Sequence, residues 1–163
     1  VHFELLQVTS DMLIPQRWVG PCNAADEFDA IQPTILQHGP NRLQALCRSG
    51  QGVITQLWSD DGGESWSAMT RTELPNPNSG IDAVTLQDGR HLLVYNPVAE
   101  GRTPITVAIS SQGEQWEPVL VLEDRPGEYS YPAVIQAANG EVHVTYTFQR
   151  RSIQHVVLDP KNF

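Results

Sequence analysis

The chain has 163 residues, of which 40% are hydrophobic, and this is enough for one folded domain with its own core. Its 19 acidic and 10 basic residues give a net charge of −9, which argues against nucleic acid and anionic membrane surfaces as partners. Neither a stretch of about 18 apolar residues nor an export signal is visible. We therefore expect a soluble protein, cytoplasmic by default, although its location is otherwise unknown.

The predicted elements are all of strand length, and most of them repeat. A first strand is predicted at residues 2–8, before three tandem repeats of about fifty residues each. Each repeat consists of an apolar strand, a Gly-bearing turn, a second strand and a third strand. The first strands are at 31–37, 81–87 and 131–137, the second at 43–47, 91–95 and 142–146, and the third at 53–58, 105–109 and 153–158.

These repeats predict an all-β fold of three four-stranded β-propeller blades. Four strands per repeat of about fifty residues are typical of such blades, and no segment has apolar residues at helical spacing. We expect a single propeller-type domain over residues 1–163. Blade 1 covers about 30–75, blade 2 about 80–125 and blade 3 about 130–163.

The third repeat ends at Phe163 before a fourth strand, and the strand at 2–8 is the candidate to complete it. Three blades cannot close a ring. We expect two chains to join into a six-bladed ring by exchanging residues 2–8, which makes the protein a homodimer of half-propellers. The alternatives are that the chain is half of a longer protein, or that it is a stand-alone arc with polar end faces.

A sequence motif marks the turn at Ser59–Trp66, which fits the Asp-box pattern S-x-D-x-G-x-x-W at every fixed position. A degenerate copy lies at Ile109–Trp116. We expect Asp61 to accept hydrogen bonds from backbone amides of its own turn and the tryptophan to pack beneath the loop. Both motifs therefore indicate a fold, and Asp61 is not a catalytic candidate.

With these motifs the chain resembles the later part of the sialidase (neuraminidase) superfamily, near its BNR repeat-like members, from about residue 18 to the C-terminus. The resemblance implies a six-bladed propeller that binds a sugar carboxylate with three arginines. It also implies a tyrosine nucleophile assisted by a glutamate, with an aspartate as acid. The family's first arginine and its acid lie in early blades, for which this chain has no matching segment.

The resemblance assigns roles to individual residues. Arg48 takes the place of the second arginine and Arg102 that of the third. Tyr131 takes the place of the nucleophile, with Tyr129 as the alternative. Gln32 stands where the family has its glutamate, and an amide cannot accept a proton at neutral pH.

The residues themselves add three expectations. Two guanidinium groups that converge from neighbouring blades suit a carboxylate, because each presents paired donors and stays charged. Asp82 has in repeat two the phase of Gln32 in repeat one, so it is either a channel-facing base or a satisfied ion-pair partner. Asn78 is either a binder of sugar hydroxyls or a turn former.

The sequence leaves three functions open, with an acidic sugar or glycan as the expected partner of the first two. They are a sialidase-like exo-glycosidase, a non-catalytic carbohydrate-binding module, and a scaffold. The histidines show no shared metal spacing, and we expect no metal and no cofactor. Only Cys22 and Cys47 are present, so one optional disulfide is the most that can form.

Overall fold

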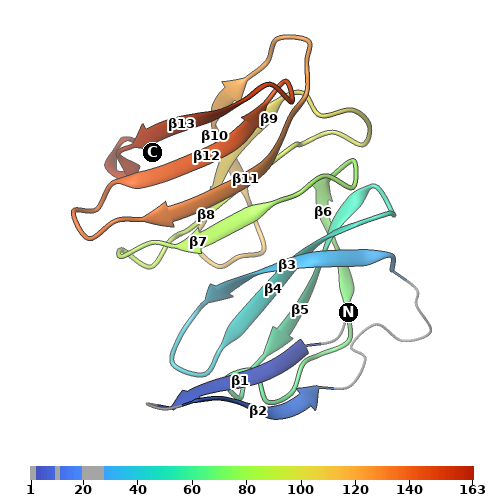
Figure 1. The fold of residues 1–163 in the computed structure, drawn as a ribbon, viewed down its shortest axis with the longest axis vertical. Helices are drawn as coiled ribbons and strands as arrows, with labels where there is room; N and C mark the ends of the chain where they lie inside the picture. The colour runs from blue at the N-terminus through green and yellow to red at the C-terminus, as the bar shows by residue number, and fades with distance from the viewer. Residues whose placement is uncertain (1–2, 10–11, 20–27) are drawn as a thin grey trace.

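A computed structural model describes residues 3–9, 12–19 and 28–163 of the chain, the first two ranges by their backbone alone. Cys22, and with it the predicted optional disulfide, lies outside these described residues. The described part is all-β and contains thirteen strands (Figure 1). The strands are β1 Phe3–Thr9, β2 Met12–Val19, β3 Ala30–Gln37, β4 Leu43–Ser49, β5 Val53–Ser59, β6 Thr70–Pro75, β7 Asp82–Thr85, β8 His91–Tyr95, β9 Ile105–Ser110, β10 Glu117–Glu123, β11 Tyr129–Gln136, β12 Val142–Phe148 and β13 Ser152–Leu158.

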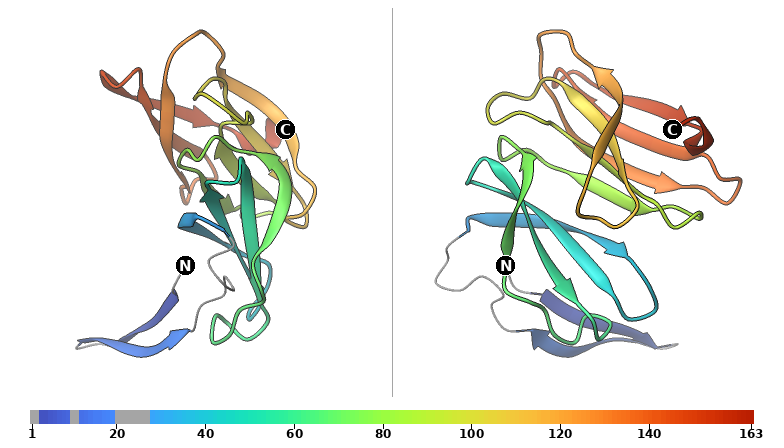
Figure 2. Two further views of the ribbon diagram at one scale, coloured as in Figure 1. Left: turned by 90° about the vertical axis from the view of Figure 1, so that its right-hand side faces the viewer. Right: turned by 180° about the vertical axis from the view of Figure 1, so that it is seen from behind.

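Three antiparallel sheets follow the order of the repeats. Two have four strands, β3-β4-β5-β6 and β7-β8-β9-β10, and the third has three, β11-β12-β13. Figures 1 and 2 show the sheets following one another along the long axis of the molecule, with β7 between β3 and β11. The prediction of an all-β fold made of propeller blades is confirmed. Within the described ranges the one helix is the 3₁₀ turn Pro160–Asn162, and no helix there is long and apolar enough to cross a membrane.

The first strand pairs within the chain in its own hairpin. β1 corresponds to the strand predicted at 2–8, and it pairs with β2 in a separate two-stranded sheet. β13 is the edge of the third sheet. Within one chain, therefore, β1 does not supply the fourth strand of that sheet. An exchange between two chains stays a prediction.

The hydrogen-bonded repeat differs slightly from the fifty-residue apolar pattern. The last ladder positions before the three hairpin turns are Gln37, Thr85 and Gln136, which lie 48 and then 51 residues apart. Three residues before each of them stand Thr34, Asp82 and Ala133. Asp82 thus occupies in blade 2 the ladder position that Thr34 occupies in blade 1. The sequence had matched Asp82 with Gln32, and this prediction is wrong by two residues.

Gln32 and Tyr131 instead share a position, five residues before the last ladder pair. Each lies where the strand register shifts, and each has a positive φ, 53° at Gln32 and 52° at Tyr131. Non-glycine residues rarely adopt this conformation, and it is typical of β-bulges that redirect a side chain. Gly80 stands at the same place in the middle repeat.

The apolar core lies between consecutive sheets. Leu36, Leu46 and Ile54 of blade 1 pack against Ile81 and Leu93 of blade 2. A second cluster joins the apolar faces of blades 2 and 3. Each interface removes many side chains from water, at about 25 cal/mol per Å² of apolar surface.

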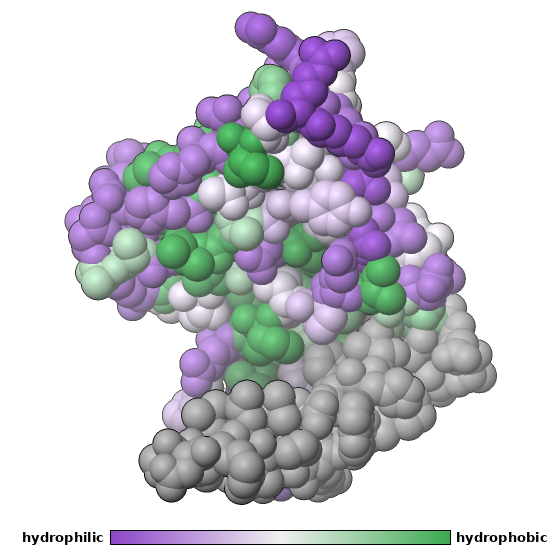
Figure 3. All heavy atoms as spheres, viewed as in Figure 1, coloured by the Kyte–Doolittle hydropathy of each residue, from purple (hydrophilic) through white to green (hydrophobic). Residues whose placement is uncertain are grey.

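Further apolar side chains stay exposed on the end face of blade 3, at Ile135, Ile153 and Val157. On the outer face of blade 1 Ile35 is exposed, but most apolar side chains, such as Ala45 and Leu57, are buried in a cluster of their own. On the face seen in Figure 3, apolar residues form separate patches among polar ones. The end face of blade 3 is therefore not the polar surface that a stand-alone arc was expected to have.

The Asp-box has the structural role that its sequence predicts. Asp61 accepts hydrogen bonds from Ser65 N (2.9 Å) and from the hydroxyl of Ser59 (2.8 Å). The Ser65 hydroxyl also donates to Asp61 (2.5 Å), and this bond first, then the other two, lower the pKa of Asp61 to about 2. In the degenerate copy Ser110 accepts from Gly113 N (2.8 Å), and the Trp116 indole donates to Gly113 O (3.0 Å).

Candidate functional site

The candidate site is centred on Tyr131, whose side chain is 50% exposed. Its backbone bulge lies near the start of β11, and the guanidinium carbon of Arg102 is 5.4 Å from the centre of its ring. Arg102 comes from the loop between β8 and β9, and Arg48 from the end of β4. Hydrogen bonding and positive charge from Arg102 and then Arg48 lower the pKa of the Tyr131 phenol. The structure therefore brings these three predicted residues together from three blades.

Three predicted binding residues carry buried polar atoms without hydrogen-bond partners. They are Nε of Arg48, Oδ1 of Asn78 and Nη1 of Arg102. Folded proteins satisfy most of their buried polar atoms, because each unmade bond costs about 1–3 kcal/mol. Two of these atoms are donors on cations and one is a neutral acceptor. The two guanidinium donors match a ligand with an anionic group, and the Asn78 oxygen matches a hydroxyl or amide N–H donor.

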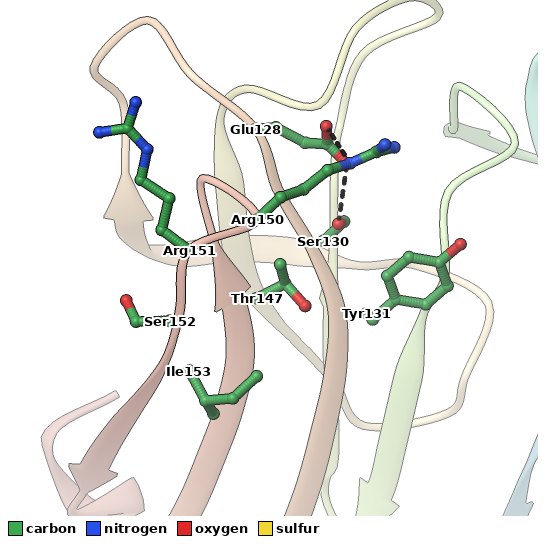
Figure 4. A pocket seen from close by; sticks show the side chains of 8 residues that line it. All are labelled: Glu128, Ser130, Tyr131, Thr147, Arg150, Arg151, Ser152 and Ile153. Carbon is green, nitrogen blue, oxygen red and sulfur yellow. Dashed lines mark hydrogen bonds and ion pairs between the residues drawn. The ribbon is translucent and has the colours of Figure 1, made fainter.

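A hollow of about 460 Å³ adjoins Tyr131 on its blade 3 side (Figure 4). Glu128 lies at its rim, where the Arg150 Nε is 2.6 Å from Glu128 Oε2. Arg102 Nη1 is 3.7 Å from the other carboxylate oxygen, too far for a hydrogen bond. In Figure 4 the side chain of Arg150 reaches across to Glu128, whereas Arg151 points away.

These charges make the site locally positive on an acidic molecule. The hydrogen bond from Arg150, together with the charges of Arg150 and Arg102, lowers the pKa of Glu128 and keeps it ionised. Glu128 thus offsets one of the three arginines around Tyr131, against a net charge of −9 for the chain. The excess of positive charge favours an anionic ligand.

Tyr129 lies in the core, with 1% of its surface exposed. Its ring packs edge-on against Phe148, and Gln149 Nε2 lies 3.4 Å from its hydroxyl. Asn96 donates to the Tyr129 carbonyl (3.0 Å) and to Pro104 O (2.8 Å). This network holds the strand that leads to Tyr131, so burial favours a structural role for Tyr129.

Gln32 and Asp82 lie in neighbouring blades, but they are held differently. Gln32 is exposed at its bulge. Asp82 uses both carboxylate oxygens, one with Thr34 Oγ1 (2.9 Å) and the other with Val134 N (2.8 Å). Neither of these partners belongs to the group around Tyr131. Asp82 is thus engaged between blades, which is close to the satisfied partner considered from the sequence.

Sequence reasoning missed Arg150 and Asn96. Arg150 lies in the turn between β12 and β13 and has a φ of 53°. Its neighbours in the turn, Gln149 and Arg151, are also polar. Nothing in this pattern predicts that Arg150 forms an ion pair with Glu128. Asn96 directly follows a strand and precedes a proline, which is typical of a turn former. Its burial and its bonds to Ser79, Pro104 and Tyr129 depend on tertiary packing.

Comparisons with known proteins agree with this architecture. A family model described as a BNR repeat-like domain matches residues 4–144. A comparison with curated protein sequences gave no match.

Several solved structures are similar in fold. The NanB sialidase from Streptococcus pneumoniae has a TM-score of 0.77 at 15% identity, over 98% of this chain and 28% of its own. A leech intramolecular trans-sialidase has a TM-score of 0.72 at 17% identity, over 92% and 26%. A protein of unknown function from Dyadobacter fermentans has a TM-score of 0.66 at 20% identity, over 86% and 40%. The chain thus spans about a quarter of the length of the two sialidases, and at these identities the likeness shows the fold.

Proposed function

Since the chain belongs to the BNR repeat-like family, we propose that this sialidase-type module recognises a carboxylate-bearing sugar at Arg48, Arg102 and Tyr131. The observation that carries the proposal is the set of buried donors without partners on the two arginines, next to Tyr131. A carboxylate accepts from guanidinium groups in strong, charge-assisted hydrogen bonds. Asn78 Oδ1 suits a sugar hydroxyl or amide N–H as donor. The similar sialidases support an acidic sugar as the ligand class.

Calorimetry with N-acetylneuraminic acid and with glucuronic acid tests this proposal. We expect binding to wild type and an affinity about tenfold or more lower for Arg48→Ala, because a charge-assisted hydrogen bond contributes about 1.5–3 kcal/mol. Arg42→Ala is the matched control, since Arg42 lies on the same sheet and pairs with Asp60 (3.0 Å). Equal affinities for wild type and Arg48→Ala, or equal binding of the sugar methyl esters, would refute the proposal.

A second candidate function, glycoside cleavage, is favoured by the lowered pKa of Tyr131. A phenol of lowered pKa supplies more of the nucleophilic phenolate near neutral pH. The phenolate oxygen would form a bond to the anomeric carbon as the glycosidic C–O bond breaks, and the departing oxygen would take a proton from water. A second water would then hydrolyse the tyrosyl–sugar bond and regenerate the phenolate. The amide of Gln32 cannot act as the assisting base in this step.

A fluorogenic sialoside assay separates cleavage from binding alone. If Tyr131 is the nucleophile, we expect release by wild type and none by Tyr131→Phe. Gln32→Glu supplies a carboxylate at the shared bulge position, and we expect it to raise the rate. Binding without release in all three proteins would assign the chain to the non-catalytic class.

The ring is a further part of the proposal. The exposed apolar end face of blade 3 supports closure by a second copy, since large apolar surfaces on soluble proteins mark interfaces. The three-stranded third sheet has an edge that a strand from a second copy can extend.

A further inference from the structure

Asp82 bridges the two blades on either side of its own. It begins β7, which lies between β3 and β11 (Figure 1). One carboxylate oxygen accepts from Thr34 Oγ1 of blade 1 at 2.9 Å, and the other from Val134 N of blade 3 at 2.8 Å. One side chain therefore joins blades 1 and 3 through blade 2.

Both partners of Asp82 lie close to residues of the candidate site. Thr34 pairs with Leu46, two residues before Arg48 on β4. Val134 follows Tyr131 by three residues on β11. The route from Arg48 to Tyr131 through Asp82 consists of these two short strand segments and two hydrogen bonds.

The hydrogen bonds of Asp82 are well placed to be strong. Thr34 is buried, with 8% of its surface exposed, and its hydroxyl also accepts from Ala83 N at 3.1 Å. Val134 lies on β11, an edge strand of its sheet. No strand of that sheet can accept a hydrogen bond from an amide on the free edge of β11. Bonds to an ionised carboxylate are roughly twice as strong as those between neutral groups. Asp82 therefore fixes where β11 lies relative to β3.

The conformation of Tyr131 depends on such external support. Its φ of 52° costs about 1 kcal/mol or more for a non-glycine residue, and surrounding contacts must hold it. Gly80 leaves room for the ring, because a Cβ there would be 3.2 Å from Tyr131 Cδ1 and 3.4 Å from its Cα. Asn96, through the Tyr129 carbonyl, fixes the strand before Tyr131, and Asp82 fixes it after.

We propose that Asp82 is a positioning residue that sets the spacing between the arginines and the Tyr131 phenol by holding β11 against β3. The inference rests on the proposed function only for the identity of the ligand. Its direct consequence is a property of the free protein. When β11 is released, the phenol moves away from Arg48 and Arg102, and its pKa rises toward the ordinary value near 10.

Ultraviolet titration of the phenols tests the inference without ligand. Tyr131 is the one exposed tyrosine of the four, since Tyr95, Tyr129 and Tyr146 are at most 2% exposed, so it ionises first and Tyr131→Phe identifies its signal. We expect Asp82→Ala to raise the pKa of Tyr131 by about half a unit or more. Loss of a negative charge alone would lower that pKa, so a rise reports displacement.

Two further variants keep the test decisive. Thr34→Val removes one of the two bridges without touching the carboxylate and should raise the pKa in the same direction. Thr85→Val is the matched control, because it removes the bond from Gln37 N (2.9 Å) between the same two blades at the far end of β7. It should leave the pKa unchanged.

An unchanged pKa in folded Asp82→Ala overturns the inference. If that variant does not fold, an unchanged pKa in Thr34→Val overturns it instead. Sugar affinity measured on the same proteins separates the two proposals. A raised pKa together with a wild-type protein that binds no acidic sugar leaves the positioning role standing and removes the proposed function.

Discussion

Gly113 shows how much a single residue contributes to the contact between blades 1 and 2. It has a φ of 76°, and a Cβ there would lie 2.1 Å from Gln44 Oε1 and 2.7 Å from His38 Cε1. Its carbonyl accepts from Gln44 Nε2 (2.8 Å). The degenerate Asp-box thus keeps its glycine because the turn is inserted against blade 1.

Gly113→Ala should therefore destabilise the protein by about 2–4 kcal/mol, because both backbone strain and a clash with buried groups oppose it. Gly89→Ala is the matched control. Gly89 has a φ of 88° but nothing within 4 Å of an added Cβ, so strain alone should cost about 1 kcal/mol. Urea unfolding measures both values. Equal losses in the two variants would show that the contact with blade 1 adds nothing.

At this scale the sequence predicted the placement of some candidate residues and missed others. Arg48, Arg102 and Tyr131 were expected together, and the structure places them together, because Arg48 and Tyr131 lie near strand ends whose pattern is visible and Arg102 lies in the loop before such a strand. The phase of Asp82 was wrong because the apolar pattern repeats every fifty residues while the ladder repeats after 48 and 51. The ion pair of Arg150 depends on turn geometry, which the sequence does not reveal.

At the scale of elements, a chain of hydrogen bonds crosses from β7 and β8 to blade 1. Thr85 Oγ1 and His91 Nδ1 are 3.1 Å apart, as are His91 Nε2 and His38 Nδ1, and His38 Nε2 and Gln44 Oε1. Gln37 N donates to Thr85 Oγ1, so the hydroxyl can donate onward. Every donor in this chain of hydrogen bonds meets an acceptor when both imidazoles are neutral and protonated on Nε2. A second proton on His38 would face the Nε2–H of His91 and would have no acceptor while His91 keeps this tautomer.

This chain predicts a loss of stability in mild acid. Burial, and then the nearby His38, lower the pKa of His91 to about 4 from an ordinary value of 6.5, and burial lowers that of His38. The unfolded chain therefore binds more protons between these values. The stability that the neutral His91 contributes to the folded protein is complete above pH 6.5 and is lost as the pH falls toward 4.

Urea unfolding at pH 7 and pH 5 measures this loss. For His91 it should reach up to about 2 kcal/mol at pH 5, since one pKa unit corresponds to 1.36 kcal/mol. His91→Gln should reduce the difference between the two pH values, while His155→Gln, on the exposed face of blade 3, should keep it. An equal pH dependence in wild type and His91→Gln would exclude His91 as its source.

The strands themselves were predictable because turn residues and apolar runs mark them. The third strands at 53–58, 105–109 and 153–158 correspond to β5, β9 and β13. β2 was missed, since Met12–Val19 contains a proline and a charged residue and lacks strict alternation. The pairing of β1 was not predictable, because an edge strand can pair with any free edge nearby.

At the scale of the whole molecule, the end faces of the arc govern association. Ile153 on blade 3 is 69% exposed and Ile135 is 62% exposed. Their equivalents in earlier blades, such as Leu36, are buried against the next blade. A second copy could cover these residues in the same way.

Light scattering should therefore give twice the mass of one chain, and Ile153→Glu should give a monomer. Val121→Glu is the matched control, because Val121 is 52% exposed on β10, the outermost strand of blade 2. A wild-type protein that is monomeric at all concentrations would remove the two-chain ring.

The bulge shared by Gln32 and Tyr131 has a consequence for reactivity. One backbone conformation recurs in two blades, and it carries different chemistry in each: an amide at Gln32 and a phenol at Tyr131. Since the ladders around these positions do not depend on the side chain, a point mutation there can give or remove reactivity while the architecture persists. Members of one family can then share a fold and differ in whether they cut, bind or merely support.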